Sequence, residues 1–284
     1  MTTNKEQKPA LRAPKWLRVS FSILESISPI LTYRIASFLF FTPIRFKAPK
    51  LELEYLSAAK TLTIPYKNNK IQIYEWGKSN KAVLLIHGWA GRATQVAHLA
   101  KPLIKAGYKV YSFDAPAHGN SNGRHTHFLE FSEIILELKK RFPEIESIIG
   151  HSMGGSACVH AITQGFKPKK CITISAPASV DWVLKSYCEQ INVSDKVIKN
   201  IKAHLENKFA QQFEDLSLRT MVKEINTPGL IIHCQDDVDT PAESAKQIHA
   251  NWKKSTLVLT KNLGHRRILK NKEVAQSIID FLKS

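Results

Sequence analysis

The chain has 284 residues, 43% of them hydrophobic, and a formal net charge of +17 at pH 7. This length accommodates one large α/β domain with an insertion, or two small domains. Lysine and arginine are spread along the sequence, without a recognisable nucleic-acid motif or a basic patch interleaved with aromatic residues. We therefore expect no nucleic-acid partner, and the charge indicates either contact with an anionic membrane or a basic surface without a specific purpose.

The first sixty residues (1–60) differ in pattern from the rest. Residues 1–15 are polar and basic, as is typical of a disordered tail. Residues 16–46 are rich in Leu, Ile, Phe and Tyr, but their longest uncharged stretch, 35–44, is about half of what a bilayer crossing requires. Arg34 also breaks the apolar run that a signal peptide would need. The sequence therefore predicts neither a transmembrane helix nor a signal peptide.

Two interpretations of residues 16–46 remain. They form helices that pack on the outside of the main domain, or an interfacial segment that lies on anionic lipid. Nine Lys or Arg against two Glu between residues 1 and 50 support the second interpretation. In that case Phe38-Leu39-Phe40-Phe41 is the part that inserts, and the protein is cytoplasmic with peripheral contact to the membrane.

From residue 61 to 284, β-like and helical segments alternate. A hairpin comes first, with strands at 62–66 and 71–76 around the turn Lys67-Asn68-Asn69-Lys70. Later segments predict strands at 83–86, 109–113, 147–149, 171–175, 230–234 and 256–259, and helices at 93–106, 128–142, 156–164, 242–252 and 272–282. This order predicts an α/β domain with a mostly parallel, doubly wound sheet flanked by helices. A charged helical stretch without glycine at about 178–227 interrupts the alternation.

The four cysteines show no C-x-x-C pair and no metal-ligand spacing. Cys171 and Cys234 fall inside apolar strand-like runs, which predicts small buried side chains in a reducing, intracellular compartment. His118, His125 and His127 raise the question of a metal site. No carboxylate completes a ligand set around them, so we expect no metal.

Polar residues follow several of the expected strands where each strand ends. They are His87-Gly88-Trp89, the loop 114–121, Ser152, Asp236-Asp237 and Gly264-His265. In parallel sheets the active site forms outside the carboxyl ends of the strands. We therefore expect these groups to meet at one edge of the sheet.

Ser152 is the centre of Gly150-His151-Ser152-Met153-Gly154, the G-x-S-x-G pattern of a nucleophile elbow between a strand and a helix. A neutral serine hydroxyl needs a base to take its proton, and His265 is the candidate because imidazole titrates near neutral pH. An aspartate would hold the imidazole in the correct tautomer, and Asp236 and Asp237 both qualify.

The order of serine, acid and histidine resembles that of α/β-hydrolase-fold serine hydrolases of the esterase and lipase type, over about residues 62–284. The resemblance favours Asp237, because it lies four residues before Pro241. It implies that His87-Gly88-Trp89 is the oxyanion loop and that the insertion at about 178–227 is a helical lid. Cys234, where many members have glycine, and Arg266, where they have an apolar residue, depart from the pattern.

The expected site therefore has Ser152, Asp237 and His265 as catalytic residues. Backbone N–H groups of Met153 and Trp89 would bind the oxyanion, since Met153 begins a helix. His87, Gly88, Trp89 and Trp182 would contact substrate, and Arg266 and Arg267 would meet an anionic group if the substrate has one. No cofactor is implied.

The leading hypothesis is a serine hydrolase that cleaves a small-molecule carboxylic ester or thioester through an acyl-enzyme. One alternative keeps the same residues for an acyltransferase or a carbon–carbon bond hydrolase. An alternative of another class is a non-catalytic protein of the same fold that docks on membranes or partners through its N-terminal segment.

Overall fold

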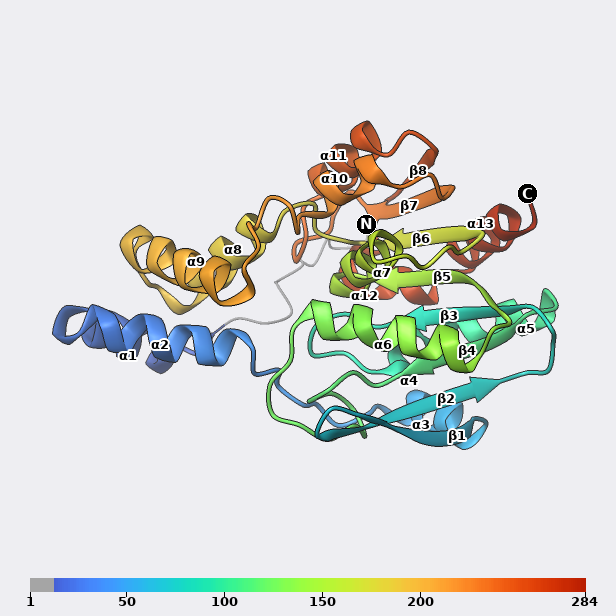
Figure 1. The fold of residues 1–284 in the computed structure, drawn as a ribbon, viewed down its shortest axis with the longest axis horizontal. Helices are drawn as coiled ribbons and strands as arrows, with labels where there is room; N and C mark the ends of the chain where they lie inside the picture. The colour runs from blue at the N-terminus through green and yellow to red at the C-terminus, as the bar shows by residue number, and fades with distance from the viewer. Residues whose placement is uncertain (1–12) are drawn as a thin grey trace, which may run out of the picture.

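The structure is a computed structural model that describes residues 13–284, so the expected tail lies almost entirely outside the described residues. Eight strands form one sheet in the order β1-β2-β4-β3-β5-β6-β7-β8 (Figure 1). Their bounds are β1 Lys60–Tyr66, β2 Asn69–Trp76, β3 Ala82–Ile86, β4 Lys109–Phe113, β5 Ile145–His151, β6 Lys170–Ile174, β7 Gly229–Cys234 and β8 Ser255–Thr260. The pairs β1–β2 and β2–β4 are antiparallel and all the others are parallel. The predicted mostly parallel α/β sheet is confirmed.

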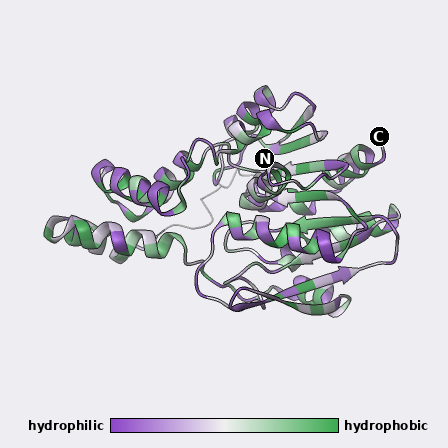
Figure 2. Cartoon of the chain, in the orientation of Figure 1, coloured by the Kyte–Doolittle hydropathy of each residue, from purple (hydrophilic) through white to green (hydrophobic). Residues whose placement is uncertain are grey.

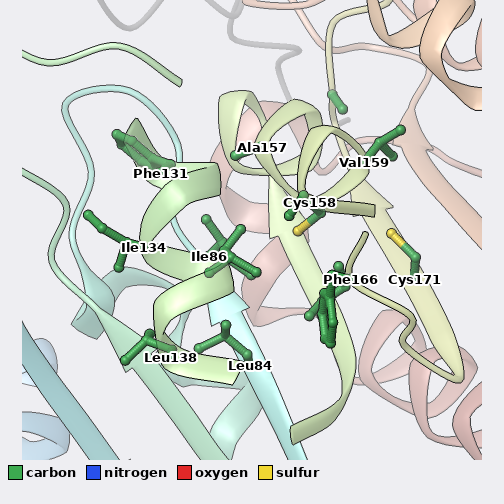
Figure 3. Close-up of a cluster of buried hydrophobic side chains, with 14 of the residues drawn as sticks. Leu84, Ile86, Phe131, Ile134, Leu138, Ala157, Cys158, Val159, Phe166 and Cys171 are labelled. Atoms are coloured by element: carbon green, nitrogen blue, oxygen red, sulfur yellow. The ribbon is translucent and has the colours of Figure 1, made fainter. Parts of the chain in front are cut away.

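Helices cover both faces of this sheet, which explains why every residue of β3 is buried. One face packs against α6 (Phe128–Arg141), α7 (Met153–Thr163), α10 (Leu218–Met221) and α11 (Glu243–Asn251). Figure 3 shows the core on this side, where Leu84 and Ile86 of β3 meet Phe131, Ile134 and Leu138 of α6. The other face packs against α3 (Lys50–Ser57), α4 (Ala93–Val96), α5 (Ala100–Lys105) and α13 (Lys272–Lys283).

Two boundaries differ from the sequence prediction in ways that matter for the site. The expected helix at 93–106 is divided by a 3₁₀ turn at Ala97–Leu99, and Pro102 falls in the first turn of α5, where its missing N–H costs little. β5 extends to His151 and α7 begins at Met153, so Ser152 alone forms the connection.

Four helices form a cap beside the carboxyl end of the parallel strands: α1 (Lys15–Ile27), α2 (Pro29–Phe40), α8 (Val180–Ile191) and α9 (Asp195–Phe209) (Figure 1). They share a separate apolar core that includes Phe21, Ala36, Leu184 and Ile201. The Tyr187 hydroxyl donates a hydrogen bond to the Ala36 carbonyl oxygen at 2.9 Å. The N-terminal helices therefore pack on the insertion, in agreement with the first interpretation of residues 16–46.

The cap changes the interpretation of the Phe38–Phe41 segment. Only Phe38 is exposed, whereas Phe40 and Phe41 pack against Tyr187 and Phe209 inside the cap. The prediction that all four residues insert into lipid is therefore wrong. The reason is the helical repeat, which places neighbouring positions on different sides of α2. When position 38 faces outward, positions 40 and 41 face α8 and α9.

The expected insertion does not lie wholly in the cap. α8 and α9 do, but Leu218, Met221 and Val222, in and just after α10, belong to the main core beside α7 and α11. A lid at 178–227, and the division into 1–60 and 61–284, remain predictions. Along the described residues, no helix is both long enough and apolar enough to span a membrane. The cysteines Cys158, Cys171, Cys188 and Cys234 are free and buried.

Candidate active site

Ser152 lies at the tip of a strained turn between β5 and α7. Its backbone has φ 54° and ψ −125°, a region that side-chain-bearing residues rarely adopt. Glycines make the turn possible. A Cβ on Gly154 would lie 2.6 Å from the carbonyl oxygens of Ile86 and His87, and one on Gly150 would lie 2.3 Å from the Gly154 carbonyl oxygen. The G-x-S-x-G spacing thus reflects close backbone packing between β5, α7 and β3.

Asp237 and His265 form a hydrogen-bonded pair beside this turn. His265 Nδ1 lies 2.8 Å from Asp237 Oδ2, and Oδ1 of the same carboxylate accepts hydrogen bonds from the Asp239 and Thr240 amides, each at 2.9 Å. Asp236 points elsewhere, since its carboxylate accepts from the Asn262 amide at 2.6 Å. Of the two candidate acids, the structure pairs Asp237 with the histidine.

The surroundings of Asp237 keep its carboxylate ionised. Burial alone would raise its pKa, but the hydrogen bond and positive charge at His265, with the Thr240 amide, outweigh burial and lower the pKa below its usual value. His233 also lies close, with Nε2 at 3.5 Å from Asp237 Oδ2 and 2.9 Å from the Thr240 carbonyl oxygen. Burial lowers the pKa of His233, so the ring is neutral near pH 7 and adds little charge to the pair.

Two backbone amides are free to bind an oxyanion. Within residues 13–284, neither the Met153 nor the Trp89 N–H donates to another protein group. Gly88, next to Trp89, approaches the serine so closely that a Cβ there would lie 2.8 Å from Ser152 Cβ. The loop His87–Trp89 is therefore brought to Ser152, as the sequence predicts.

His87 does not contact substrate as expected. It is fully buried, its Nδ1 lies 2.8 Å from the Gly88 carbonyl oxygen, and its Nε2 accepts from the Ala115 amide at 3.1 Å. Burial lowers its pKa to about 4, which keeps the ring neutral. The prediction is wrong because both ring nitrogens are engaged in joining the 87–89 loop to the 114–121 loop.

The 114–121 loop is a second support for the same region. Asp114 accepts hydrogen bonds from the Ala93 amide at 2.7 Å, the Asn120 amide at 2.8 Å and the Tyr74 hydroxyl at 2.7 Å. His118 Nε2 accepts from the Ala90 amide at 3.0 Å. These bonds place the turn that carries the Trp89 N–H.

Arg45 connects the N-terminal segment to this second loop. Its guanidinium donates to the carbonyl oxygens of Gly119 at 3.0 Å, Ser121 at 2.7 Å and Gly123 at 3.3 Å. The segment after α2 therefore helps to hold a loop that itself supports the candidate oxyanion site. This contact could not be predicted from the sequence, because the partners of Arg45 are backbone atoms.

Cys234 and Asp236 form a clamp on the loop that carries His265. Cys234 Sγ accepts from the Leu263 amide at 3.3 Å and the Gly264 amide at 3.0 Å, while the Asp236 carboxylate accepts from Asn262. Cys234, which departs from the family pattern, thus acts on the position of His265. Sequence reasoning treated it only as an apolar core residue.

His151 supports His265 from the other side. Its Nε2 lies 2.8 Å from the His265 carbonyl oxygen, and the two rings are 4.8 Å apart between centroids. Burial lowers the pKa of His151 to about 3, so it is neutral and positions the turn, as expected, instead of acting as a base.

A cavity of about 760 Å³ opens over Ser152. Gly88, Trp89, Met153, Trp182 and His265 line it, as do apolar residues from both halves of the cap. They include Leu39, Phe40, Val183, Tyr187, Leu205 and Phe209. This size suits a small organic molecule, and the N-terminal helices contribute to its wall.

Arg266 lines the cavity, but Arg267 does not: its guanidinium donates to the carbonyl oxygens of Leu263 and Asn262, each at 3.1 Å. The idea that both arginines meet an anionic substrate is therefore wrong for Arg267. Among residues 13–284, no group of three His, Cys, Asp or Glu is arranged to hold a metal ion.

Comparison with known proteins identifies the fold family. A model of the family described as serine aminopeptidase, S33, matches residues 77–215, and one described as TAP-like protein matches residues 208–284. Together with the sheet order and the serine turn described above, these matches show that the chain has the fold of the α/β-hydrolase family.

Individual relatives agree with this assignment. The monoacylglycerol lipase of Mycolicibacterium smegmatis is 35% identical over 81 residues, which make up 26% of this chain and 29% of that protein. The chain thus matches less than a third of that relative's length. An uncharacterized hydrolase of Bacillus subtilis is 20% identical over 277 residues, covering 81% of this chain and 100% of the relative.

Solved structures share the fold. An esterase of Pyrococcus furiosus has a TM-score of 0.65 at 21% identity, covering 85% of this chain and 98% of that one. A membrane phospholipase A, described as a bacterial virulence factor, has a TM-score of 0.63 at 16% identity, covering 95% and 98%. The second match reaches into the N-terminal helices, because it covers more of the chain than the catalytic domain alone.

Proposed function

We propose that the protein is a serine hydrolase that cleaves a carboxylic ester with an apolar acyl group. The observation that carries the proposal is the Asp237–His265 pair, at 2.8 Å, beside a strained Ser152 in a largely apolar cavity. A serine, a histidine that can take its proton and an ionised acid that orients the histidine are what nucleophilic acyl transfer requires. The relatives described as a lipase and an esterase support the same reaction class.

The reaction proceeds in two halves. His265 takes the proton from Ser152 Oγ as that oxygen attacks the ester carbonyl carbon, and the Met153 and Trp89 N–H groups bind the resulting oxyanion. The carbon–oxygen bond of the leaving alcohol then breaks, and His265 passes its proton to that alcohol. Water repeats the sequence on the acyl-enzyme, which releases the carboxylic acid and restores Ser152.

Asp237 holds His265 with Nδ1 protonated, so that Nε2 is the nitrogen available to the serine. Its lowered pKa keeps a negative charge next to the imidazolium that forms during the attack. Gly88 and Trp89 border the reacting carbonyl, while Trp182 and the apolar cap residues enclose the acyl chain.

Two related reactions use the same residues. A thioester would pass through the same acyl-enzyme with a thiol as leaving group, and an acyltransferase would replace water with another acceptor. Cleavage of a carbon–carbon bond also remains open as an alternative. We place ester hydrolysis first because the relatives described as a lipase and an esterase belong to that reaction class.

A fluorophosphonate probe tests the serine directly. We expect the wild-type protein to be labelled and Ser152→Ala not to be labelled. Ser156→Ala is the matched control, since Ser156 lines the same cavity one helical turn further along α7 and should leave labelling unchanged. If neither the wild type nor the control is labelled under native conditions, the non-catalytic alternative replaces the proposal.

A further inference from the structure

The outer side of α2 is largely exposed to solvent, although Phe38 on this side also packs edge-on against His125 at 4.4 Å between ring centroids. Its inner side packs Ala36, Leu39 and Phe40 into the cap core, yet its opposite side exposes Ile30, Leu31, Ile35 and Phe38. A helix that is apolar all round is normally buried all round. This side of α2 therefore has the composition of a buried surface while it faces solvent.

Helix α1 continues the same surface. Trp16, Val19, Ile23 and Ile27 recur every three or four residues and so lie on one side of the helix. Trp16 is 68% exposed and Ile27 is 74% exposed. Figure 2 shows hydrophobic segments along both α1 and α2. We call these four residues, with the four exposed residues of α2, the outer face.

The outer face contains most of the large hydrophobic side chains that are exposed in residues 13–284. Every large hydrophobic side chain that is exposed in residues 13–284, except Val238, lies between Trp16 and Leu53. Scattered apolar residues on a surface need no explanation, but a concentration on one pair of helices indicates a binding surface.

The charges beside the outer face are positive. Lys15 on α1 and Arg34 on α2 are exposed, and the single acidic residue between 13 and 50 is Glu25. The Glu25 carboxylate is occupied, because it accepts a hydrogen bond from the Ser194 amide at 3.1 Å. Exposed apolar residues flanked by cations are the composition of helices that lie in the interface of an anionic bilayer.

We propose that the outer face docks on the surface of an anionic lipid bilayer. The apolar side chains enter the boundary between headgroups and acyl chains, and Lys15 and Arg34 face the lipid phosphates. The inner sides of the same helices carry Leu17, Leu39 and Phe40 into the wall of the cavity above Ser152. Docking does not depend on catalysis. Only the delivery of a lipid ester from the bilayer to Ser152 rests on the proposed function.

A second copy of the chain is a less suitable partner. In a symmetric dimer the same surface meets itself, so the cations around one outer face would oppose those of the other. Such like-charge contacts oppose association, whereas a bilayer with anionic headgroups supplies the opposite charge.

Vesicle flotation with the full chain tests the proposal. We expect binding to phosphatidylcholine vesicles that contain phosphatidylglycerol, much weaker binding to phosphatidylcholine alone, and weakening as salt is added. Replacing Ile27→Ser and Ile30→Ser together should lower partitioning by about tenfold or more, because both side chains are largely exposed and enter the interface. Equal binding by this double variant and the wild type would overturn the proposal.

A matched pair of charge variants separates local from overall charge. Lys15→Glu with Arg34→Glu changes the net charge by the same amount as Lys272→Glu with Lys283→Glu, on exposed positions of α13 at the other end of the molecule (Figure 1). The first pair should weaken binding to anionic vesicles several-fold, and the second should weaken it much less. Equal weakening by both pairs would show attraction by overall charge and would refute docking through the outer face.

Two further readouts keep the proposals apart. If sedimentation velocity shows a dimer that Ile27→Ser with Ile30→Ser converts to a monomer, a second copy covers the outer face and the lipid proposal is wrong. Hydrolysis of p-nitrophenyl butyrate should be unchanged in the surface variants of α1, α2 and α13. A protein that binds vesicles but hydrolyses no ester would refute the proposed function and leave docking intact.

Discussion

The sheet edge around Ser152 is stabilised mainly by hydrogen bonds, whereas the cap beside its cavity is stabilised mainly by apolar packing. At the sheet edge, backbone groups are fixed by buried polar side chains, as where Asp114 accepts three hydrogen bonds from Tyr74, Ala93 and Asn120. The cap is held mainly by apolar packing, such as the Phe40 and Tyr187 rings at 5.1 Å between centroids. Hydrogen bonds fix distances closely, whereas apolar contacts tolerate exchange of side chains.

This contrast indicates in which region the protein should tolerate substitutions. In the proposed function the sheet edge holds the reacting groups, so small displacements there should abolish activity. The cap would then select the acyl group, so changes there should alter selectivity and leave the chemistry intact. The experiments below test that division, beginning with the largest expected effect.

Gly154→Ala should strongly damage the sheet edge. The added Cβ would lie 2.6 Å from two backbone oxygens of β3 and the loop after it, so either α7 or β3 must move. Displacement of the serine and the oxyanion amides should lower kcat/KM by about a hundredfold or more. Ester hydrolysis measures this, with near-ultraviolet circular dichroism to show that the variant folds. A folded variant with wild-type activity would contradict the assigned geometry.

Cys234→Ala should have a smaller effect through the position of His265. It removes the sulfur that accepts from two amides of the His265 loop, each bond contributing about 1 kcal/mol. We expect kcat to fall about tenfold with KM nearly unchanged. Cys188→Ala is the matched control, since Cys188 is equally buried but lies in the cap. Equal loss of kcat in both variants would point to general destabilisation.

Phe40→Ala should change selectivity more than catalysis. The side chain lines the cavity and packs on Tyr187, so its removal weakens contact with a long acyl chain. We expect kcat/KM for p-nitrophenyl laurate to fall several-fold, up to about tenfold, with p-nitrophenyl butyrate little affected. Phe46→Ala, at an exposed position, should affect neither ester. A proportional loss on both esters would mean that the cap does not select the acyl chain.

The buried histidines of the sheet edge should make stability depend on pH. Burial lowers the pKa of His87 to about 4 and that of His151 to about 3, from 6.5 in an exposed chain. Between the pKa of each histidine in the folded protein and 6.5, the unfolded chain binds more protons than the folded protein. The free energy of unfolding therefore falls as pH decreases below about 6.5. Each histidine contributes about 1.4 kcal/mol per pH unit.

Urea unfolding at pH 7 and pH 5 measures this dependence. His87→Gln should reduce the fall in stability between the two pH values, whereas His249→Gln, at an exposed position, should leave it unchanged. An identical pH dependence in the wild type and His87→Gln would show that the buried ring does not titrate on unfolding.

The sheet edge could largely be predicted from the sequence, because its determinants are local. Strand ends place polar residues at one edge, and the glycines around Ser152 mark a turn that other residues cannot form. The choice between Asp236 and Asp237 needed the geometry of the loop. The roles of His87 and Cys234 also needed the structure, because both bind backbone amides of segments distant in sequence.

The cap could be predicted only in part. Helical periodicity indicates that α8 and α9 exist, but not that α1 and α2 pack against them. Helices α1 and α2 have apolar residues on more than one side, so the pattern alone does not determine which side faces a partner. For the same reason the sequence placed Phe40 and Phe41 at a membrane, although they line the cavity.

The Arg45 guanidinium has a practical consequence for protein engineering. Shortening the chain to begin at Leu51 would remove the donor that the carbonyl oxygens of Gly119, Ser121 and Gly123 share. A truncated enzyme would then lose both its N-terminal helices and part of the scaffold beneath the oxyanion loop. A loss of turnover on truncation could result from the missing helices or from the missing Arg45 hydrogen bonds. Point substitutions that leave Arg45 in place separate the two causes.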